Sequence, residues 1–208
     1  MKPETVTQIF EIFKSQNPTP RTELDYRNGF TLLIAVLLSA QATDKGVNKA
    51  TPALFDKADT PEKMLSLGLE GITEHIKTIG LYQSKAKNIV LLCQRLIDVY
   101  KGKIPDNLDD LQSLAGVGRK TANVVMNELY RHPTIAVDTH IFRLAHRLGW
   151  SKESHPDKVE QDLYKIIPKD YQLYAHHHLI LHGRYICKAR KPLCDECIIK
   201  DLCPKIID

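Results

Sequence analysis

The sequence lacks any hydrophobic run long enough to cross a membrane. Its longest apolar stretch, Phe30 to Leu38, includes Thr31 and is far shorter than the roughly 20 residues that span a bilayer. The N-terminal segment mixes acidic with apolar residues and so lacks the unbroken apolar region of a signal peptide. These absences exclude membrane association and favour a cytoplasmic, reducing compartment.

The sequence also contains no repeat of fixed period, no low-complexity segment and neither a G-x-S-x-G nor a Walker motif. With 43% hydrophobic and 26% charged residues, the chain has a globular composition. Its 208 residues fit one large domain or two small ones. A net charge of +4 does not by itself indicate nucleic-acid binding, because a mild excess commonly serves solubility.

Strand signals are almost absent, since only Thr134 to Val137 has a strand-like pattern and it is too short to found a sheet. Helical periodicity dominates instead. Val6, Ile9, Phe10 and Phe13 repeat at the spacing of one helix face. Further helices are expected at 29–41, from Thr60 onward, and at 84–100, 107–114, 119–129, 139–148, 156–166 and 171–186. The sequence therefore predicts an all-α fold.

Cysteine is scarce, yet four of the five cysteines lie close together near the end of the sequence. In a reducing compartment, soft thiolates so grouped indicate a metal or iron–sulfur site rather than disulfides. Zinc is an alternative, although zinc sites more often use two C-x2-C pairs. The fifth cysteine, Cys93, lies on an apolar helix face and is expected in the core. The grouped cysteines form the pattern C-x6-C-x2-C-x5-C at Cys187, Cys194, Cys197 and Cys203.

Basic residues accompany these cysteines. Residues 183–205 contain six Lys or Arg against three acids, and Arg190 and Lys191 lie between the first two cysteines. We predict that this loop contacts a DNA backbone, with a solvated surface as the alternative. Nearby, His178 and His182 have the spacing of metal ligands, but no H-E-x-x-H pattern accompanies them. We therefore favour structural or DNA-facing histidines for the group His176, His177, His178 and His182.

A glycine-containing turn separates two expected helices in the segment LQSLAGVGRKTA, residues 111–122. Gly116 and Gly118 permit positive φ and close approach of the backbone to another surface. The amides that open the following helix can hold a phosphate oxygen. The segment is similar to the helix-hairpin-helix motif, which binds DNA through its backbone. An ordinary helix–helix turn is the alternative.

Lys120 lies in the first turn of the second helix, where the helix dipole disfavours its ammonium form. A lysine must lose its proton to act as a nucleophile, so this position suits a reactive amine, although a phosphate contact is the commoner role. Arg119 stays charged and is better suited to a phosphate. Eighteen residues after Lys120, Asp138 can cap the next helix and supply a rigidly held carboxylate.

Together these segments resemble the endonuclease III family. The motifs LAGVGRKTANVV, TIAVDTHIFR, LILHGRYIC and the cysteine pattern carry the resemblance, with LLSAQATDK at 37–45 and IGLYQSKAKNI at 79–89. It covers essentially the whole chain. It implies a base-excision repair DNA glycosylase with abasic-site lyase activity that removes oxidised pyrimidines from double-stranded DNA. It also implies a bacterial-type, nucleoid-associated monomer.

The resemblance further implies two helical lobes with a DNA-binding cleft between them. Residues 22–132 would form a six-helix lobe with the hairpin, and residues 1–21 plus 133–208 a lobe around a [4Fe–4S] cluster held by the four C-terminal cysteines. Lys120 would attack the sugar C1′ and form a Schiff base, with Asp138 assisting. Gln41 would fill the space left by the extruded nucleotide, and Leu81 would wedge into the opposite strand.

Two positions depart from the family pattern. Ala115 replaces the usual proline before Gly116, which should leave the turn less rigid, and Gln112 stands where an acid is common. Two other functions compete. The first is an adenine glycosylase for oxidised-guanine mispairs, which would share the fold. That class lacks a lysine nucleophile, and it carries an added mispair-reading domain for which the residues after Cys203 are expected to leave no room. A non-catalytic DNA-binding module would have no use for Lys120 with Asp138.

Overall fold

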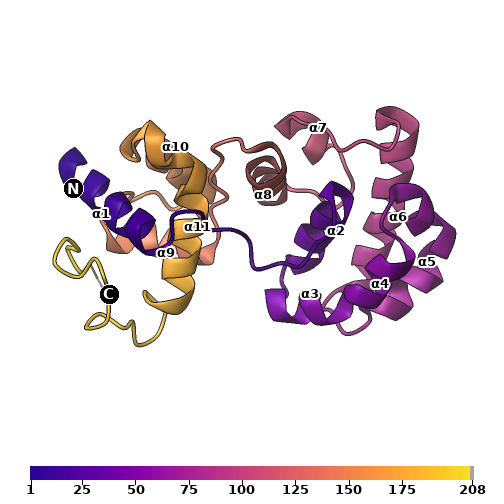
Figure 1. Ribbon diagram of the computed structural model, residues 1–208, viewed down its shortest axis with the longest axis horizontal. Helices are drawn as coiled ribbons and strands as arrows, with labels where there is room; N and C mark the ends of the chain where they lie inside the picture. The colour runs from indigo at the N-terminus through magenta and orange to yellow at the C-terminus, as the bar shows by residue number, and fades with distance from the viewer. Residues whose placement is uncertain (207–208) are drawn as a thin grey trace. The chain divides into compact units, whose positions relative to one another are not determined.

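The computed structural model describes residues 1–206, and all regular structure in that range is helical (Figure 1). The all-α prediction is therefore confirmed, and the strand-like segment at 134–137 is irregular. Within the described residues, every helix is too short or too polar to cross a membrane. The chain divides into a middle unit, Glu23–Tyr130, and a terminal unit, formed by Met1–Thr22 with Arg131–Asp208.

The middle unit is organised around its first helix, which is apolar on every side and is buried from Phe30 to Leu38. An Asn28–Thr31 capping box fixes where this helix begins, and the helix packs against the third, sixth and eighth helices of the chain. The elements are α2 (Gly29–Ser39), α3 (Asp44–Ala50), α4 (Pro52–Lys57), α5 (Pro61–Ile76), α6 (Tyr82–Tyr100), α7 (Leu108–Gln112) and α8 (Arg119–Tyr130).

Differences from the predicted helices of this unit are local. The sequence did not predict α3 and α4, because seven and six residues are too few to show a clear period. The predicted helix 29–41 ends at Ser39, because Gln41 adopts a left-handed conformation with φ of 54°. Gly68, with φ of 65°, kinks α5. Cys93 is fully buried as predicted, and burial raises the pKa of its thiol to about 12.

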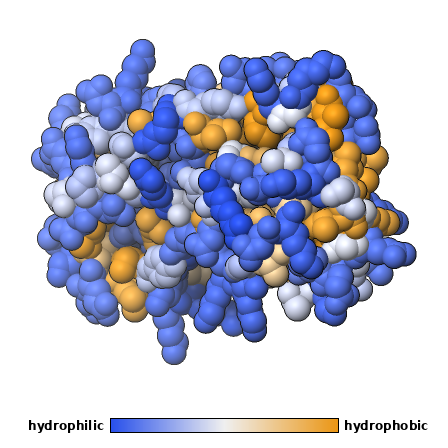
Figure 2. Space-filling model, turned by 45° about the vertical axis from the view of Figure 1, so that its right-hand side comes forward, coloured by the Kyte–Doolittle hydropathy of each residue, from blue (hydrophilic) through white to orange (hydrophobic). Residues whose placement is uncertain are grey.

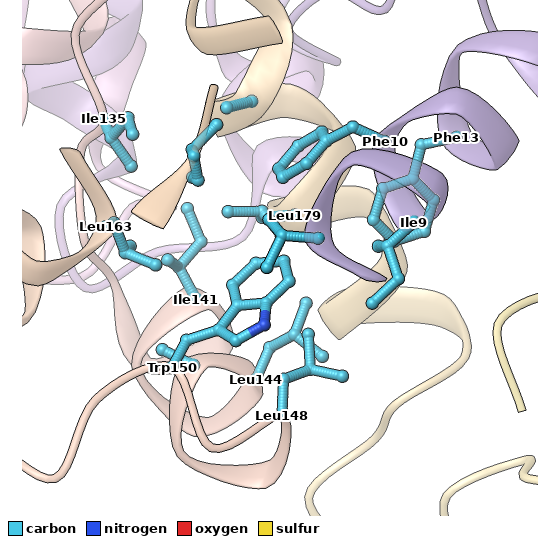
Figure 3. Close-up of a cluster of buried hydrophobic side chains, with 14 of the residues drawn as sticks. Ile9, Phe10, Phe13, Ile135, Ile141, Leu144, Leu148, Trp150, Leu163 and Leu179 are labelled. Carbon is cyan, nitrogen blue, oxygen red and sulfur yellow. The ribbon is translucent and has the colours of Figure 1, made fainter. Parts of the chain in front are cut away.

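The terminal unit joins the start of the chain to its end. Its helices are α1 (Pro3–Gln16), α9 (Thr139–Arg147), α10 (Pro156–Ile166) and α11 (Lys169–Tyr185). The buried face of α1 carries the predicted Val6, Ile9, Phe10 and Phe13 and packs on α11. Figure 3 shows Phe10 and Trp150 in this core, where their rings stack with centroids 5.8 Å apart.

Histidines also enter the interior of the terminal unit. His176, His177, His178 and His182 are each 7% exposed or less, so the structural alternative holds for this group. The His178 ring stacks on Phe13, and its Nε2 donates a hydrogen bond to the backbone oxygen of Asn17 at 2.8 Å. Burial lowers the pKa of His178, and it lowers that of His182 to about 4. Both imidazoles are therefore neutral at pH 7.

The face seen in Figure 2 is mostly hydrophilic, with hydrophobic areas among the hydrophilic side chains. Leu81 and Leu91 are the most exposed of the large hydrophobic residues in the described range, at 59% each. Leu91 lies within α6, whereas Leu81 precedes this helix at its N-cap. Exposure of a leucine in a turn leaves an apolar side chain available to another molecule.

Candidate functional site

The predicted hairpin is formed by α7, a tight turn and α8. Gly116 has φ of 77°, and a Cβ there would lie 3.0 Å from the Asn88 side chain. Both conformation and packing therefore require glycine at this position. At Gly118, by contrast, a Cβ would meet nothing within 4 Å, so the protein's own packing does not require a glycine there. A bare backbone in open space suits close approach by an external group.

The two departures from the family pattern leave this hairpin intact. The turn closes with Ala115 in place of proline, and the Val117 amide donates to the Leu114 oxygen at 3.1 Å. The Gln112 side chain is exposed and donates to the Leu108 oxygen of its own helix at 3.2 Å. Neither residue disturbs the Gly116 conformation.

Lys120 is exposed in the first turn of α8, next to the exposed Arg119. Residues 121–128 of the same helix are all buried, which fixes the backbone that carries Lys120. The first helical hydrogen bond runs from the Ala122 amide to the Gly118 oxygen at 3.0 Å. The hairpin thus presents a primary amine on a rigid helix start, two residues after an open glycine.

Asp138 is half-buried and caps α9 in the terminal unit, as predicted. Its Oδ1 accepts hydrogen bonds from the amides of His140 at 2.9 Å and Ile141 at 2.8 Å. Within residues 1–206, its Oδ2 has no hydrogen-bond donor. The cap therefore fixes the carboxylate through one oxygen and leaves the other oxygen available for a proton or a developing positive charge.

Gln41 and Leu81 both have left-handed backbones, with φ of 54° and 60°, and both are exposed. This conformation is uncommon for residues other than glycine, and such strain concentrates at functional sites. The two turns lie together, because a Cβ built on Gly80 would be 3.6 Å from the backbone oxygen of Gln41. The structure thus brings two predicted DNA-facing residues to one place in the middle unit.

The four C-terminal cysteines line a single cavity of about 30 Å³ beneath α9 and α11. None of the chain's five cysteines forms a disulfide. Burial raises the pKa of the Cys197 and Cys203 thiols, and the charges of neighbouring cysteines raise both further. A bound cation would offset that repulsion.

Among residues 1–206, no three His, Cys, Asp or Glu side chains are placed to hold a single metal ion. Four cysteine sulfurs that line one cavity supply the soft donors that an iron–sulfur cluster uses. The Nε2 of His182 lies 3.6 Å from the Sγ of Cys197, which adds a polar contact at the cavity wall. The donor set therefore fits an iron–sulfur cluster.

Two arginines of α9, which the sequence analysis did not single out, hold the loop between the first two cysteines. Arg147 donates to the backbone oxygens of Lys188 at 2.7 Å and Ala189 at 3.1 Å. Arg143 donates to the backbone oxygens of Cys187 and Gly183. Their i, i+4 spacing within the predicted helix 139–148 was the available signal.

This tethering leaves the predicted DNA-backbone residues on the outside of the loop. Arg190 and Lys191 are both exposed, and Lys191 has a left-handed backbone with φ of 52°. The loop closes where the Leu193 amide donates to the Ile186 oxygen at 3.0 Å. Its two basic side chains are thus carried by a fixed backbone.

Comparison with known proteins gives a family for this arrangement. Residues 34–169 match the model of the HhH-GPD superfamily base excision DNA repair protein, and residues 187–203 match the iron–sulfur binding domain of endonuclease III. The first match spans the hairpin, Lys120 and Asp138. The second begins and ends at the outer two of the four cysteines, and it establishes an iron–sulfur cofactor for this chain.

Curated relatives agree over nearly the full length. Endonuclease III of Rickettsia conorii is 58% identical over 203 residues, covering 98% of this chain and 97% of that protein. Endonuclease III of Escherichia coli K12 is 53% identical over 196 residues, covering 94% and 93%.

A solved structure of a trapped endonuclease III–DNA covalent intermediate is 44% identical, with a TM-score of 0.91 over 99% of this chain and 97% of that one. A non-covalent endonuclease III–DNA complex matches with the same identity and TM-score. The chain therefore belongs to the endonuclease III family within the HhH-GPD superfamily, and it is a base-excision DNA glycosylase with lyase activity.

Proposed function

We propose that this glycosylase removes oxidised pyrimidines from double-stranded DNA and uses Lys120 as its nucleophile. In this proposal the protein acts as a monomer close to the bacterial nucleoid. The observation that carries the proposal is the exposed Lys120 on a fixed helix start, two residues after the open backbone at Gly118. A DNA phosphate bound by the amides at this helix start would hold the sugar close to the amine. Arg119 would add a charge-assisted contact to the same backbone.

In the proposed reaction, the neutral Nζ of Lys120 attacks C1′ of the sugar. The bond from C1′ to the base breaks, and its electron pair leaves with the base. Opening of the sugar ring gives a Schiff base, after which loss of a C2′ proton expels the 3′ phosphate by β-elimination. Asp138, whose Oδ1 caps α9, helps to deprotonate the amine and stabilises positive charge that develops on the sugar.

Gln41 and Leu81 take the roles of filling and wedging in this proposal. Extruding a nucleotide from the duplex leaves an unstacked gap that costs a few kcal/mol. A polar side chain at Gln41 can fill the gap, and the exposed apolar side chain of Leu81 can enter the opposite strand. Their adjacent left-handed turns support this division of labour.

We further propose that Cys187, Cys194, Cys197 and Cys203 are the ligands of a [4Fe–4S] cluster, which supplies a rigid centre for the C-terminal segment. Arg190 and Lys191, exposed on the adjoining loop, bind DNA phosphates. Replacing both by alanine should weaken DNA binding and reduce the slope of log affinity against log salt by about 2. Unchanged affinity across a salt series would contradict this contact.

Borohydride trapping tests the proposed chemistry. The native protein, incubated with thymine-glycol duplex DNA and borohydride, should form a covalent complex, whereas Lys120→Ala should form none. Arg119→Ala is the matched control, since it removes a cation from the same helix turn but keeps the amine, and it should bind DNA more weakly yet still be trapped. Covalent trapping of Lys120→Ala would show that Lys120 is not the nucleophile. In a separate assay, release of adenine from a duplex in which it lies opposite oxidised guanine would favour the adenine glycosylase instead.

A further inference from the structure

A buried lysine in the middle unit has no part in the proposed chemistry. Lys85 is only 5% exposed although it lies in the first turn of α6. Within residues 1–206, its ammonium has no carboxylate partner, and it donates to the backbone oxygen of Leu38 at 2.9 Å. Burial lowers the pKa of Lys85 because the charged form loses hydration. An unpaired buried ammonium is destabilising unless its surroundings stabilise the charge.

The C-terminus of α2 provides that stabilisation. The last carbonyls of a helix have no partner in their own helix and carry partial negative charge. In α2 the Val36 oxygen accepts a hydrogen bond from the Ser39 hydroxyl. The Leu37 oxygen accepts from the Ala40 amide, and the Ser39 oxygen accepts from the Ala42 amide. The Leu38 oxygen accepts from Lys85, so a side chain of α6 completes the C-terminus of α2.

This bond lies between the two strained turns. Leu38 is three residues before Gln41, and the Lys85 amide donates to the Leu81 oxygen at 3.0 Å. Lys85 therefore contacts both turns. Its backbone amide closes the first turn of α6 after Leu81, and its side chain binds the end of α2 before Gln41. The backbones of the two turns are also close together, since a Cβ built on Gly80 would lie 3.6 Å from the Gln41 oxygen.

We propose that Lys85 is a positioning residue that fixes the separation of Gln41 and Leu81, so that both side chains enter DNA together when a nucleotide is extruded. The inference rests on the DNA-filling roles proposed above for these two residues. A cation is used here because it reaches a carbonyl that no backbone amide satisfies. A displacement of about 1 Å at such a site can lower a rate up to 100-fold.

The test compares two DNA substrates under single-turnover trapping conditions. One carries thymine glycol in a fully paired duplex, and the other carries an abasic site in an unpaired bubble flanked by duplex arms. Only the first needs a nucleotide to be extruded and the gap to be filled. Lys85→Met keeps the apolar stem and removes the donor, and it should lower the ratio of paired to bubble rates about 10- to 100-fold.

Lys87→Met is the matched control, because Lys87 is exposed on the same helix, and it should leave the ratio unchanged. A merely structural role for Lys85 would lower both rates equally, which would overturn the inference. If Lys85→Met does not fold, Lys85→Gln, which is neutral and too short to keep the bond, should lower the same ratio. A native ratio in a folded variant would also overturn it.

Two further variants, Gln41→Ala and Leu81→Ala, distinguish the positioning role of Lys85 from the proposed filling and wedging roles of Gln41 and Leu81. Both should lower the ratio. If neither does, the proposed filling and wedging roles fail. If both do while Lys85→Met keeps the native ratio, the filling roles stand and only the positioning role of Lys85 is wrong.

Discussion

The cores of the two units differ in the kinds of side chain that they bury. The middle unit has an aliphatic core in which Leu32, Leu33, Ile34, Ile72 and Ile89 are fully buried. The terminal unit encloses aromatic rings and neutral imidazoles, and three of the cysteines pack against its core. Apolar burial dominates the first core, although it also encloses the hydrogen-bonded Lys85, whereas the second core depends in addition on its imidazoles and on a bound cofactor. We therefore expect the units to respond differently to the same kind of change.

The largest difference should follow loss of the cluster. Cys197→Ala removes one of four proposed ligands from the core of the terminal unit, and cofactor binding there contributes directly to folding. Iron content and visible absorbance should fall, and the amides of α9 and α11 should lose protection from hydrogen exchange. The amides of α2 and α6 should keep theirs, since these helices bury aliphatic side chains in the middle unit.

Cys93→Ala is the control for this comparison, because Cys93 is fully buried in the middle unit. It should keep all of its iron and destabilise only the middle unit, by about 1 kcal/mol for one lost sulfur. Loss of iron in Cys93→Ala, or full protection of α11 in Cys197→Ala, would remove the contrast between the units.

Within the middle unit, the two hairpin glycines should separate folding from DNA binding. Gly116→Ala forces a Cβ into a left-handed conformation and against Asn88, and it should cost about 2–4 kcal/mol in urea unfolding. Gly118→Ala meets no protein atom and should change stability by less than about 0.5 kcal/mol. It should nevertheless weaken DNA affinity, because the added methyl group lies where a phosphate would approach. Equal effects of the two substitutions on stability would contradict this assignment.

In the terminal unit, Asp138 combines a cap with a charge, and two substitutions separate these properties. Asp138→Ala removes the bonds to His140 and Ile141 and should destabilise the unit by about 1 kcal/mol. Asp138→Asn keeps a good capping oxygen and should cost little stability, yet it should still slow base release. Trapping rates measured beside urea unfolding test this, and native activity in Asp138→Asn would limit Asp138 to capping.

Sequence patterns anticipated the elements whose signal is local. The helix that begins at Gly29, the turn at Gly116 and the cap at Asp138 each follow from a few adjacent residues. Lys85 shows where this reasoning ends. A lysine near the start of a helix is expected to be solvated, whereas the burial of Lys85 depends on the Leu38 oxygen, 47 residues away in the sequence. Short helices such as α3 and α4 are not predicted from the sequence for a related reason, because their packing rather than a hydrophobic period stabilises them.

The smallest expected effect concerns pH and the terminal unit alone. His178 donates from Nε2 to Asn17, and its buried Nδ1 has no hydrogen-bond partner within the described residues. Protonation would place an N–H where nothing accepts it, in agreement with the lowered pKa. The unfolded chain then binds the proton more readily than the folded one. Stability should therefore be full above the ordinary histidine pKa of about 6.5 and should decrease as the pH falls below it.

The fluorescence of Trp150, the only tryptophan in the sequence and a residue of the terminal core, can follow this unit during urea unfolding. His178→Gln keeps a donor for the Asn17 oxygen but cannot titrate, so it should reduce the loss of stability between pH 7 and pH 5. Some loss should persist, because His182, with its pKa lowered to about 4, contributes in the same direction. An unchanged pH dependence in His178→Gln would show that protonation of this ring does not limit the core.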